Sequence, residues 1–363
     1  MAPGLVEGPP GAALGEAVRV IGRRALLQGA AGAVLPLPVA SVLAAPPLPL
    51  AGGVGGGLVD AGRTSPPLTP PASGRGIWPP AEHFPLWPAG RLPNAPRRLP
   101  TPAPVMEGSP GHEELHLRGV AEPIVGVYRP DRPDGRALLA MPGGGYEFLS
   151  VENEGINVAR TFCPLGVTVF VLAYRLPGEG WLEPQDVPLQ DAQRAMRLIR
   201  ARATTFGIDP AKLGCIGFSA GGLLAASLAV AHADPVYTRV DAADAGSARP
   251  AFVGLVYPVI TAARMRVGTL AAARFDTNAR VRRDTPPLFI AHALDDPVVP
   301  FAEPMAMLTA ARDAGVPVEA HFFQEGGHGF GPRYLSPDLP GARWPILFDA
   351  WVGRALSARP ANG

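Results

Sequence analysis

The sequence has few cysteines, almost no lysine and little net charge, and each shortage excludes a class of protein. Two cysteines among 363 residues cannot form a framework of disulfides, and no C-x-x-C or histidine-rich spacing indicates a metal site. Lys212 is the only lysine, and a formal net charge of +1 gives no indication of binding to nucleic acid or another polyanion. We therefore expect no metal, no organic cofactor and no nucleic-acid partner.

Long hydrophobic runs are also missing. The segment 29–43 is weakly apolar, and two prolines interrupt it, so it is poorly suited to span a membrane. The preceding residues Arg23–Gln28 resemble the twin-arginine export pattern, and cleavage after Ala44 is plausible from its small and aliphatic neighbours. We therefore expect residues 1–45 to be a twin-arginine-type export signal, with the mature protein periplasmic or secreted and not stably inserted in the membrane.

Proline and glycine are abundant instead, with 45 and 44 residues. Residues 46–104 hold many of the prolines and few periodic apolar runs, which is typical of a Pro/Gly-rich leader or linker. Two aromatic tripeptides, Ile77-Trp78-Pro79 and Leu86-Trp87-Pro88, interrupt this leader and are placed to pin it against a folded domain. We expect the main domain at 105–357, followed by a tail at 358–363, and leave open a start near residue 76.

From about residue 120 short apolar segments alternate with helical ones. Strands are predicted at 124–128, 137–141, 167–173, 213–218, 252–257, 288–291 and 318–323, and helices at 151–163, 189–203, 220–232, 303–314 and 344–356. The first strand alternates enough to be an edge strand, and the arginines of the second helix are expected on its exposed face. Fully apolar strands between helices predict an α/β fold with a mostly parallel, doubly wound sheet and helices on both faces.

The pattern G-x-S-x-G lies where one of these strands meets the next helix. Gly217, Ser219 and Gly221 occupy its fixed positions. A serine in a sharp strand-to-helix turn needs neighbours without side chains, because the strand and the helix would otherwise collide. With 44 glycines the pattern can also arise by chance, but the strand before it and the helix after it favour a nucleophile.

Both partners that a serine nucleophile needs follow in the chain. A base must take the hydroxyl proton, and a third group must orient that base. Asp295 and Asp296 follow the strand at 288–291, and His328 lies in a glycine-flanked loop after the strand at 318–323. This is the order of serine, acid and histidine in α/β hydrolases. Adjacent carboxylates point apart, and we prefer Asp296, which precedes a Pro-Val-Val-Pro segment, over Asp295.

A glycine run supplies candidate donors for an oxyanion. Gly143-Gly144-Gly145 follows the strand at 137–141, where a backbone without side chains can approach a substrate carbonyl. Ala220, directly after Ser219, is the second expected donor. A flexible turn or a phosphate loop is the alternative for the glycine run, but a phosphate loop would need a following Lys-Ser/Thr or a G-x-G-x-x-G pattern, and neither is present.

A set of motifs runs through residues 120 to 355. They are PGGGY (142–146), YRLP (174–177), PLQDAQRAMRLIRA (188–201), GIDPAKLG (207–214), GFSAGG (217–222), YPVI (257–260), HALDDPVVP (292–300) and GGHGFG (326–331). In combination they closely resemble the α/β-hydrolase esterases often labelled acetylxylan esterase-like or esterase/lipase, which are related to the feruloyl-esterase and hormone-sensitive-lipase-like groups. PGGGY stands where the lipase-like relatives have HGGG.

This resemblance implies specific roles. The triad would be Ser219, Asp296 and His328, and the oxyanion donors would be Gly144, Gly145 and Ala220. The cap region, Thr261 to Asp284, is short and rich in arginine here. Tyr146 and Trp181 are candidates for lining the substrate pocket; surface packing is an equally good account of Trp181.

The sequence therefore predicts an exported serine carboxylic-ester hydrolase that acts through an acyl-enzyme. The family label and the export signal favour short-acyl esters, such as acetyl groups, on a small molecule or a polysaccharide. One alternative is a serine peptidase of the prolyl-oligopeptidase type, although the leader is too short for the β-propeller of those enzymes. The other is a non-catalytic binding protein with the hydrolase fold.

Overall fold

A computed structural model describes residues 78–107 and 113–358, and its centre is an eight-stranded sheet. The strands, in spatial order, are β1 (His83–Pro85), β4 (Ile124–Tyr128), β7 (Thr168–Ala173), β5 (Ala137–Met141), β8 (Leu213–Phe218), β9 (Val253–Val256), β12 (Leu288–Ala293) and β13 (Val318–Phe323). The predicted export signal at 1–45, much of the predicted leader and nearly all of the tail lie outside the described residues. Each strand predicted from the sequence is present, with bounds shifted by two residues at most.

Six neighbouring strands of the sheet, from β7 to β13, are parallel, and β4 pairs antiparallel with β7. The prediction that residues 124–128 form an edge strand is wrong, because β1 pairs antiparallel with β4 and covers its outer side. A three-residue strand within a proline-rich segment leaves no periodic signal, so β1 could not be predicted from the sequence.

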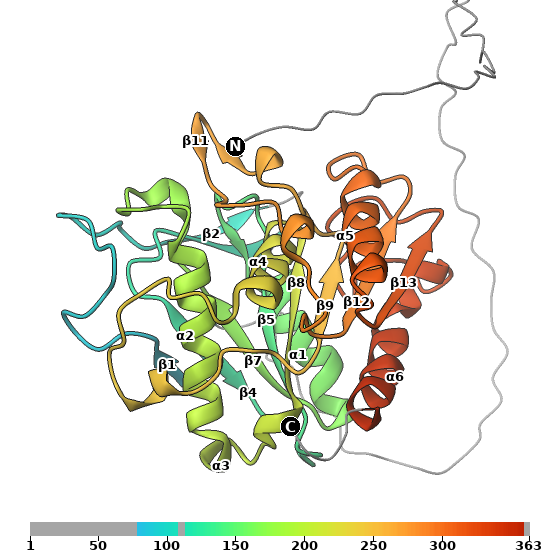
Figure 1. The fold of residues 1–363 in the computed structure, drawn as a ribbon, viewed down its shortest axis with the longest axis horizontal. Helices are drawn as coiled ribbons and strands as arrows, with labels where there is room; N and C mark the ends of the chain where they lie inside the picture. The colour runs from blue at the N-terminus through green and yellow to red at the C-terminus, as the bar shows by residue number, and fades with distance from the viewer. Residues whose placement is uncertain (1–77, 108–112, 359–363) are drawn as a thin grey trace, which may run out of the picture. The chain divides into compact units, whose positions relative to one another are not determined.

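The helices cover both faces of the sheet, as Figure 1 shows. A Cβ added to Gly217 of β8 would touch α4 (Ser219–Ala231), whereas one added to Gly254 of β9 would touch Phe348 of α6 (Trp344–Ser357). Gly217 is in register with Leu255, the neighbour of Gly254, and successive residues of a strand face opposite sides. The helices α4 and α6 therefore lie on opposite faces.

Four further helices complete the layers. They are α1 (Asn157–Phe162), α2 (Val187–Ala201), α3 (Ala203–Phe206) and α5 (Ala302–Asp313). The helix α1 packs with α6, since the Phe162 ring lies 5.6 Å from that of Phe348, and α2 packs with α4. The helix predicted at 151–163 is divided into a π-helical turn, Glu152–Ile156, followed by α1 and a 3-10 turn.

Two small sheets flank the carboxyl ends of the parallel strands, where the glycine run and Ser219 lie. One consists of β2 (Ala103–Glu107), β3 (Glu114–Arg118) and β6 (Leu149–Ser150), and the other is the hairpin of β10 (Arg266–Val267) and β11 (Leu270–Ala271). The hairpin lies within the region that the sequence identified as a short cap. Among the residues that the structure describes, no helix combines the length and apolar character needed to cross a membrane.

Buried ion pairs connect α2 to neighbouring segments of the chain. Arg194 is almost fully buried and donates to Asp241 and Asp244, so the prediction that the arginines of this helix lie on its exposed face is wrong for this residue. Asp191, also fully buried, accepts hydrogen bonds from Arg175 at 2.7 to 3.1 Å. Periodicity places a residue on a helix face, but only the tertiary structure supplies the carboxylates that make a buried arginine stable.

The N-terminal residues 78–104 belong to the same compact unit as the sheet. Trp87 is 6% exposed, and its indole N–H donates to Asp191 at 2.7 Å. Phe84 and Leu86 also join the core. The domain start predicted at residue 105 is therefore too late, and the alternative that was left open, a start near residue 76, agrees better with the structure. Leu86 and Trp87 pack in the core, as expected of a segment that holds the leader against the domain.

Candidate active site

Ser219 occupies a strained turn between β8 and α4. Its φ of 51° lies in the left-handed region, which a residue with a side chain rarely adopts. A Cβ on Gly217 would lie 2.0 Å from the carbonyl oxygen of Gly221, and one on Gly221 would lie 2.1 Å from the carbonyl oxygen of Met141. The two glycines of the motif are therefore required because the backbone of the helix touches the strands directly.

Ser219, His328 and Asp296 form one hydrogen-bonded chain. The His328 Nε2 atom lies 2.9 Å from Ser219 Oγ, and His328 Nδ1 lies 2.7 Å from Asp296 Oδ2. The three residues follow the carboxyl ends of β8, β13 and β12, which meet at one edge of the sheet. The arrangement lets His328 accept the hydroxyl proton while Asp296 holds the imidazole tautomer.

The structure separates the roles of the two adjacent carboxylates. Asp296 also accepts the N–H groups of Val298 and Val299, at 2.8 and 2.9 Å. Burial raises the pKa of Asp296, but the hydrogen bonds from His328 and these amides outweigh burial, so the net pKa is lowered and the group stays ionised. Asp295 instead accepts the N–H of Gly327 at 2.8 Å, which holds the loop that carries His328.

The three backbone groups proposed as oxyanion donors surround Ser219. Gly144, Gly145 and Ala220 all line the same pocket as the serine hydroxyl. Gly144 has a φ of +120°, and a Cβ there would lie 2.2 Å from the Phe148 carbonyl oxygen, so only glycine fits. The Ala220 N–H lies in the first turn of α4, where no intrahelical acceptor is available and the helix dipole favours negative charge.

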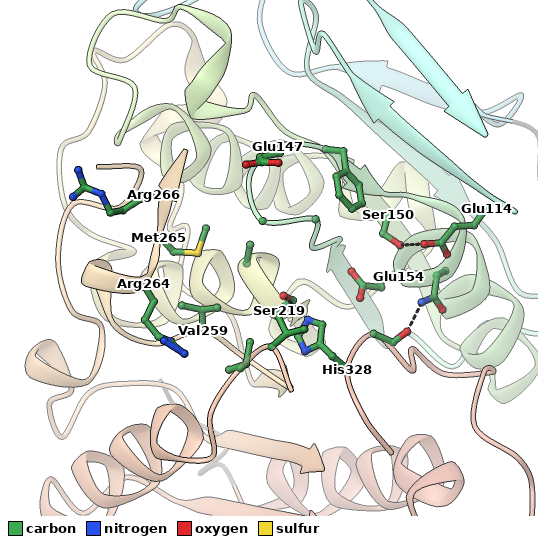
Figure 2. Close-up of a pocket in the computed structure, with 18 residues that line it drawn as sticks. Glu114, Glu147, Ser150, Glu154, Ser219, Val259, Arg264, Met265, Arg266 and His328 are labelled. Carbon is green, nitrogen blue, oxygen red and sulfur yellow. Dashed lines mark hydrogen bonds between the residues drawn. The ribbon is translucent and has the colours of Figure 1, made fainter. Parts of the chain in front are cut away.

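The pocket around Ser219 has a volume of about 560 Å³ and two unlike walls. Val259 and Met265 lie to one side of Ser219, and Glu114 and Ser150 lie to the other (Figure 2). Among the described residues there is no group of three or more histidines, cysteines or carboxylates that could hold a metal ion.

Comparison with known proteins shows that the chain is similar to several hydrolases. Residues 178–338 match the model of the prolyl oligopeptidase family. The endo-1,4-beta-xylanase B of Butyrivibrio fibrisolvens is 36% identical over 204 residues, which are 53% of this chain and 32% of that protein. The acetylxylan esterase of Xylanibacter ruminicola is 30% identical over 221 residues, or 56% of this chain and 43% of that protein. The chain thus spans less than half the length of either relative.

A solved structure covers more of the domain. The acetyl ester-xyloside bifunctional hydrolase from Caldicellulosiruptor lactoaceticus is similar with a TM-score of 0.60 and 28% identity, over 77% of this chain and 98% of that one. The chain has the α/β-hydrolase fold. The expected fold and the resemblance to acetylxylan esterase-like proteins are confirmed.

Two residues that were predicted to line the pocket do not line it. Tyr146 and Trp181 are not among the residues that line the pocket, and both side chains are buried in the protein. The Tyr146 ring packs edge-on against Tyr174, and Trp181 lies under the guanidinium of Arg175. Local sequence identifies a large aromatic near a glycine run but not the direction in which it points, so this prediction is corrected.

Several residues that do line the pocket were not predicted from the sequence. Glu154 and Asn153 come from the π-helical turn, and Arg264, Met265 and Arg266 come from the cap region. The sequence signal for the first pair was the polar stretch ENE within an otherwise apolar helical segment, where buried carboxylates are unusual.

Proposed function

We propose that this α/β hydrolase is a serine carboxylic-ester hydrolase that works through an acyl-enzyme. The observation that carries the proposal is the continuous chain from Ser219 Oγ to His328 Nε2 at 2.9 Å and from His328 Nδ1 to Asp296 at 2.7 Å, which opens into a pocket with candidate oxyanion donors. Relatives named as an acetylxylan esterase and an acetyl ester-xyloside hydrolase support the same chemistry.

The geometry suits a two-step acyl transfer, with acylation of Ser219 followed by deacylation. Ser219 Oγ attacks the ester carbonyl carbon while His328 Nε2 takes the hydroxyl proton, and the N–H groups of Gly144, Gly145 and Ala220 stabilise the oxyanion. The carbon–oxygen bond to the alcohol breaks as His328 gives that proton to the leaving oxygen. Water then attacks the acyl-enzyme by the same steps, which releases the acid and restores the serine hydroxyl.

We further propose short-acyl esters of a carbohydrate, acetyl esters above all, as substrates. Support comes from the lining of the pocket. The Val259 and Met265 side chains, which lie on the same side as Arg264 and Arg266, give an apolar surface for a small acyl group, and Glu114 and Ser150 on the other side suit a hydroxyl-rich alcohol. The printed names of the xylan-related relatives agree with this substrate class.

Hydrolysis of p-nitrophenyl esters from acetate to decanoate tests the proposal. We expect activity with an optimum at acetate, and a loss of about 10⁴-fold or more in kcat for Ser219→Ala. Ser227→Ala is the matched control, because Ser227 lies in the same helix but does not line the pocket. Release of acetate from acetylated xylo-oligosaccharides tests the carbohydrate. A wild type that is inert on every ester contradicts the proposal.

The family match over residues 178–338 makes peptidase activity the alternative to test in parallel. Hydrolysis of an aminoacyl-p-nitroanilide without hydrolysis of nitrophenyl esters would favour a peptidase of the prolyl-oligopeptidase type. Inactivity on both substrates would favour a binding protein with the hydrolase fold.

Export through the twin-arginine pathway is also proposed, on the sequence of residues 1–45 alone. Replacing Arg23 and Arg24 by lysine should retain the protein in the cytoplasm, whereas the wild type should appear in the periplasm or medium without residues 1–44. Equal distribution of both forms would contradict this proposal.

A further inference from the structure

A buried carboxylate beside Ser219 takes no part in the hydrogen-bonded chain described above. Glu154 is 3% exposed and lines the pocket, where Figure 2 shows it between Ser219 and Glu114. Burying a carboxylate is costly unless both oxygens are hydrogen-bonded, so its partners indicate what the group is for. Each of its oxygens accepts a hydrogen bond from a different segment of the chain next to the pocket.

The first partner is the loop with the candidate oxyanion donors. The N–H of Gly143 donates to Glu154 Oε2 at 2.6 Å. A Cβ on Gly143 would lie 2.9 Å from that oxygen and 2.9 Å from the Ser219 Cβ, so the carboxylate, the loop and the nucleophile are packed in direct contact. With Gly143 held in this way, the N–H groups of the next two glycines keep their direction relative to Ser219.

The second partner, Tyr257, connects Glu154 to the loop that carries His328. The hydroxyl of Tyr257 lies 2.8 Å from Glu154 Oε1 and accepts the N–H of Gly331 at 2.9 Å. Because the Tyr257 oxygen accepts from Gly331, its own proton is donated to Glu154. The Tyr257 ring also packs against the His328 imidazole, with 4.9 Å between ring centres.

A neighbour in the same π-helical turn strengthens this second connection. The amide of Asn153 donates to the carbonyl oxygen of Gly329 at 2.8 Å, next to His328. A Cβ on Gly331 would lie 2.0 Å from the Asn153 oxygen, so no side chain fits there. The turn Glu152–Ile156 therefore touches both the oxyanion loop and the histidine loop, and π-helical turns occur often at functional sites.

We propose that Glu154 is a positioning residue that holds the oxyanion loop and, through Tyr257, the His328 loop in one fixed relation to Ser219. This inference rests on the proposed serine-hydrolase function. The carboxylate itself does not touch the reacting atoms. Its effect is on the transition state, where a donor or base displaced by about 1 Å can cost a factor of about 100 in rate.

Steady-state kinetics on p-nitrophenyl acetate test the proposal with the full chain. We expect kcat to fall about 100-fold for Glu154→Ala and about 10-fold for both Glu154→Gln and Tyr257→Phe, with KM changed less than about 3-fold, because oxyanion and base interactions are made in the transition state. Glu154→Gln keeps an acceptor for the Gly143 N–H, and Tyr257→Phe keeps the ring, so these two variants carry the test if Glu154→Ala does not fold. Glu325→Gln, an exposed carboxylate of the His328 loop, is the matched control and should equal the wild type.

A double-mutant cycle isolates the connection through Tyr257. In the Glu154→Ala background, Tyr257→Phe should cost clearly less than the roughly 10-fold that it costs in the wild type, since Glu154 acts on the His328 loop through the tyrosine hydroxyl. Additive losses in kcat for the two substitutions would overturn the inference. So would Glu154 variants whose kcat and KM equal those of the control Glu325→Gln. In both cases the wild type would still be an esterase. A wild type inert on every ester overturns the proposed function and this inference together.

Discussion

Asp296 and Asp295 are adjacent in sequence, yet their surroundings assign them different tasks. Asp296 accepts hydrogen bonds from His328 and from two backbone amides, and its side chain is 1% exposed. Asp295 is exposed and accepts one amide of the His328 loop. In the proposed mechanism, a carboxylate held in this way orients the imidazole and stabilises the imidazolium that forms when the serine proton is taken.

Replacing each aspartate by asparagine should separate these tasks. Asp296→Asn should lower kcat by about 10⁴-fold, because the amide favours the wrong imidazole tautomer. Asp295→Asn should change kcat by less than about 3-fold, because its amide oxygen can still accept the Gly327 N–H. Ester hydrolysis under saturating substrate measures both, and a larger loss for Asp295→Asn would reverse the assignment.

The pKa of Glu154 makes the stability of the fold depend on pH. Burial raises its pKa to about 7, and the hydrogen bonds from Gly143 and Tyr257 offset burial only in part. A carboxyl whose pKa is higher in the folded than in the unfolded state contributes stability at low pH. That contribution is lost as the pH rises from about 4.5 through about 7.

Glu154→Gln should therefore become more stable relative to the wild type as the pH rises. Between pH 4.5 and pH 8 the difference in free energy of unfolding between variant and wild type should move by about 3 kcal/mol in favour of the variant. Urea unfolding of the variant and the wild type at both pH values measures it. A difference that is constant across this range would contradict the raised pKa.

At the scale of an element, the turn from β8 into α4 depends on close approach of backbone atoms. Gly221 lies in the first turn of α4 against the carbonyl oxygens of Met141 and Pro142, at the end of β5. Backbone atoms cannot move aside as a flexible side chain can. The same contact brings the start of α4 next to the glycine run that follows β5.

Adding one methyl group to this turn should be costly. Gly221→Ala should destabilise the fold by about 3 kcal/mol through overpacking against a rigid backbone, and should reduce ester hydrolysis as the turn shifts. Gly353→Ala is the control, since Gly353 is exposed within α6 and a Cβ there meets no atom within 4 Å. We expect it to stabilise by about 0.5–1 kcal/mol. Thermal unfolding distinguishes the two, and equal effects would contradict the packing argument.

At the scale of the whole molecule, residues 78–104 are part of the folded unit. The strand β1 extends the sheet beyond β4, and the Trp87 ring lies between α2 and the segment around Tyr237, with 4.9 Å between the two aromatic ring centres. The guanidinium groups of Arg175 and Arg194 also lie 5.7 and 5.6 Å from the Trp87 ring centre. This segment thus covers a buried, charged layer that would otherwise face solvent.

Trp87→Ala should therefore destabilise the entire domain. We expect a loss of about 3–5 kcal/mol, because the substitution removes a large buried ring and one donor to the buried Asp191. Leu99→Ala, at a side chain 47% exposed in the same segment, should change stability by less than about 0.5 kcal/mol. A Trp87→Ala variant as stable as Leu99→Ala would show that the segment is dispensable for the fold.

The sequence by itself determined the parallel strands, the main helices and the order of the site residues. Continuous apolar strands between helical segments specify a parallel sheet, and the turn at Ser219 needs Gly217 and Gly221 for local steric reasons. Since the carboxyl ends of parallel strands share one edge, the order of Ser219, Asp296 and His328 already implied that they would meet there. These features are encoded in short stretches of chain, which is why they could be read without coordinates.

Only the tertiary structure decided which polar groups are buried and what they contact. The Asp241 and Asp244 partners of Arg194 lie some 50 residues away along the chain, and Tyr257, which contacts Glu154, lies 103 residues away. The same applies to Tyr146 and Trp181, whose side chains turn into the protein rather than into the pocket. A buried charge is stable only when distant segments supply its partners, and such pairings have no period that a local pattern can reveal.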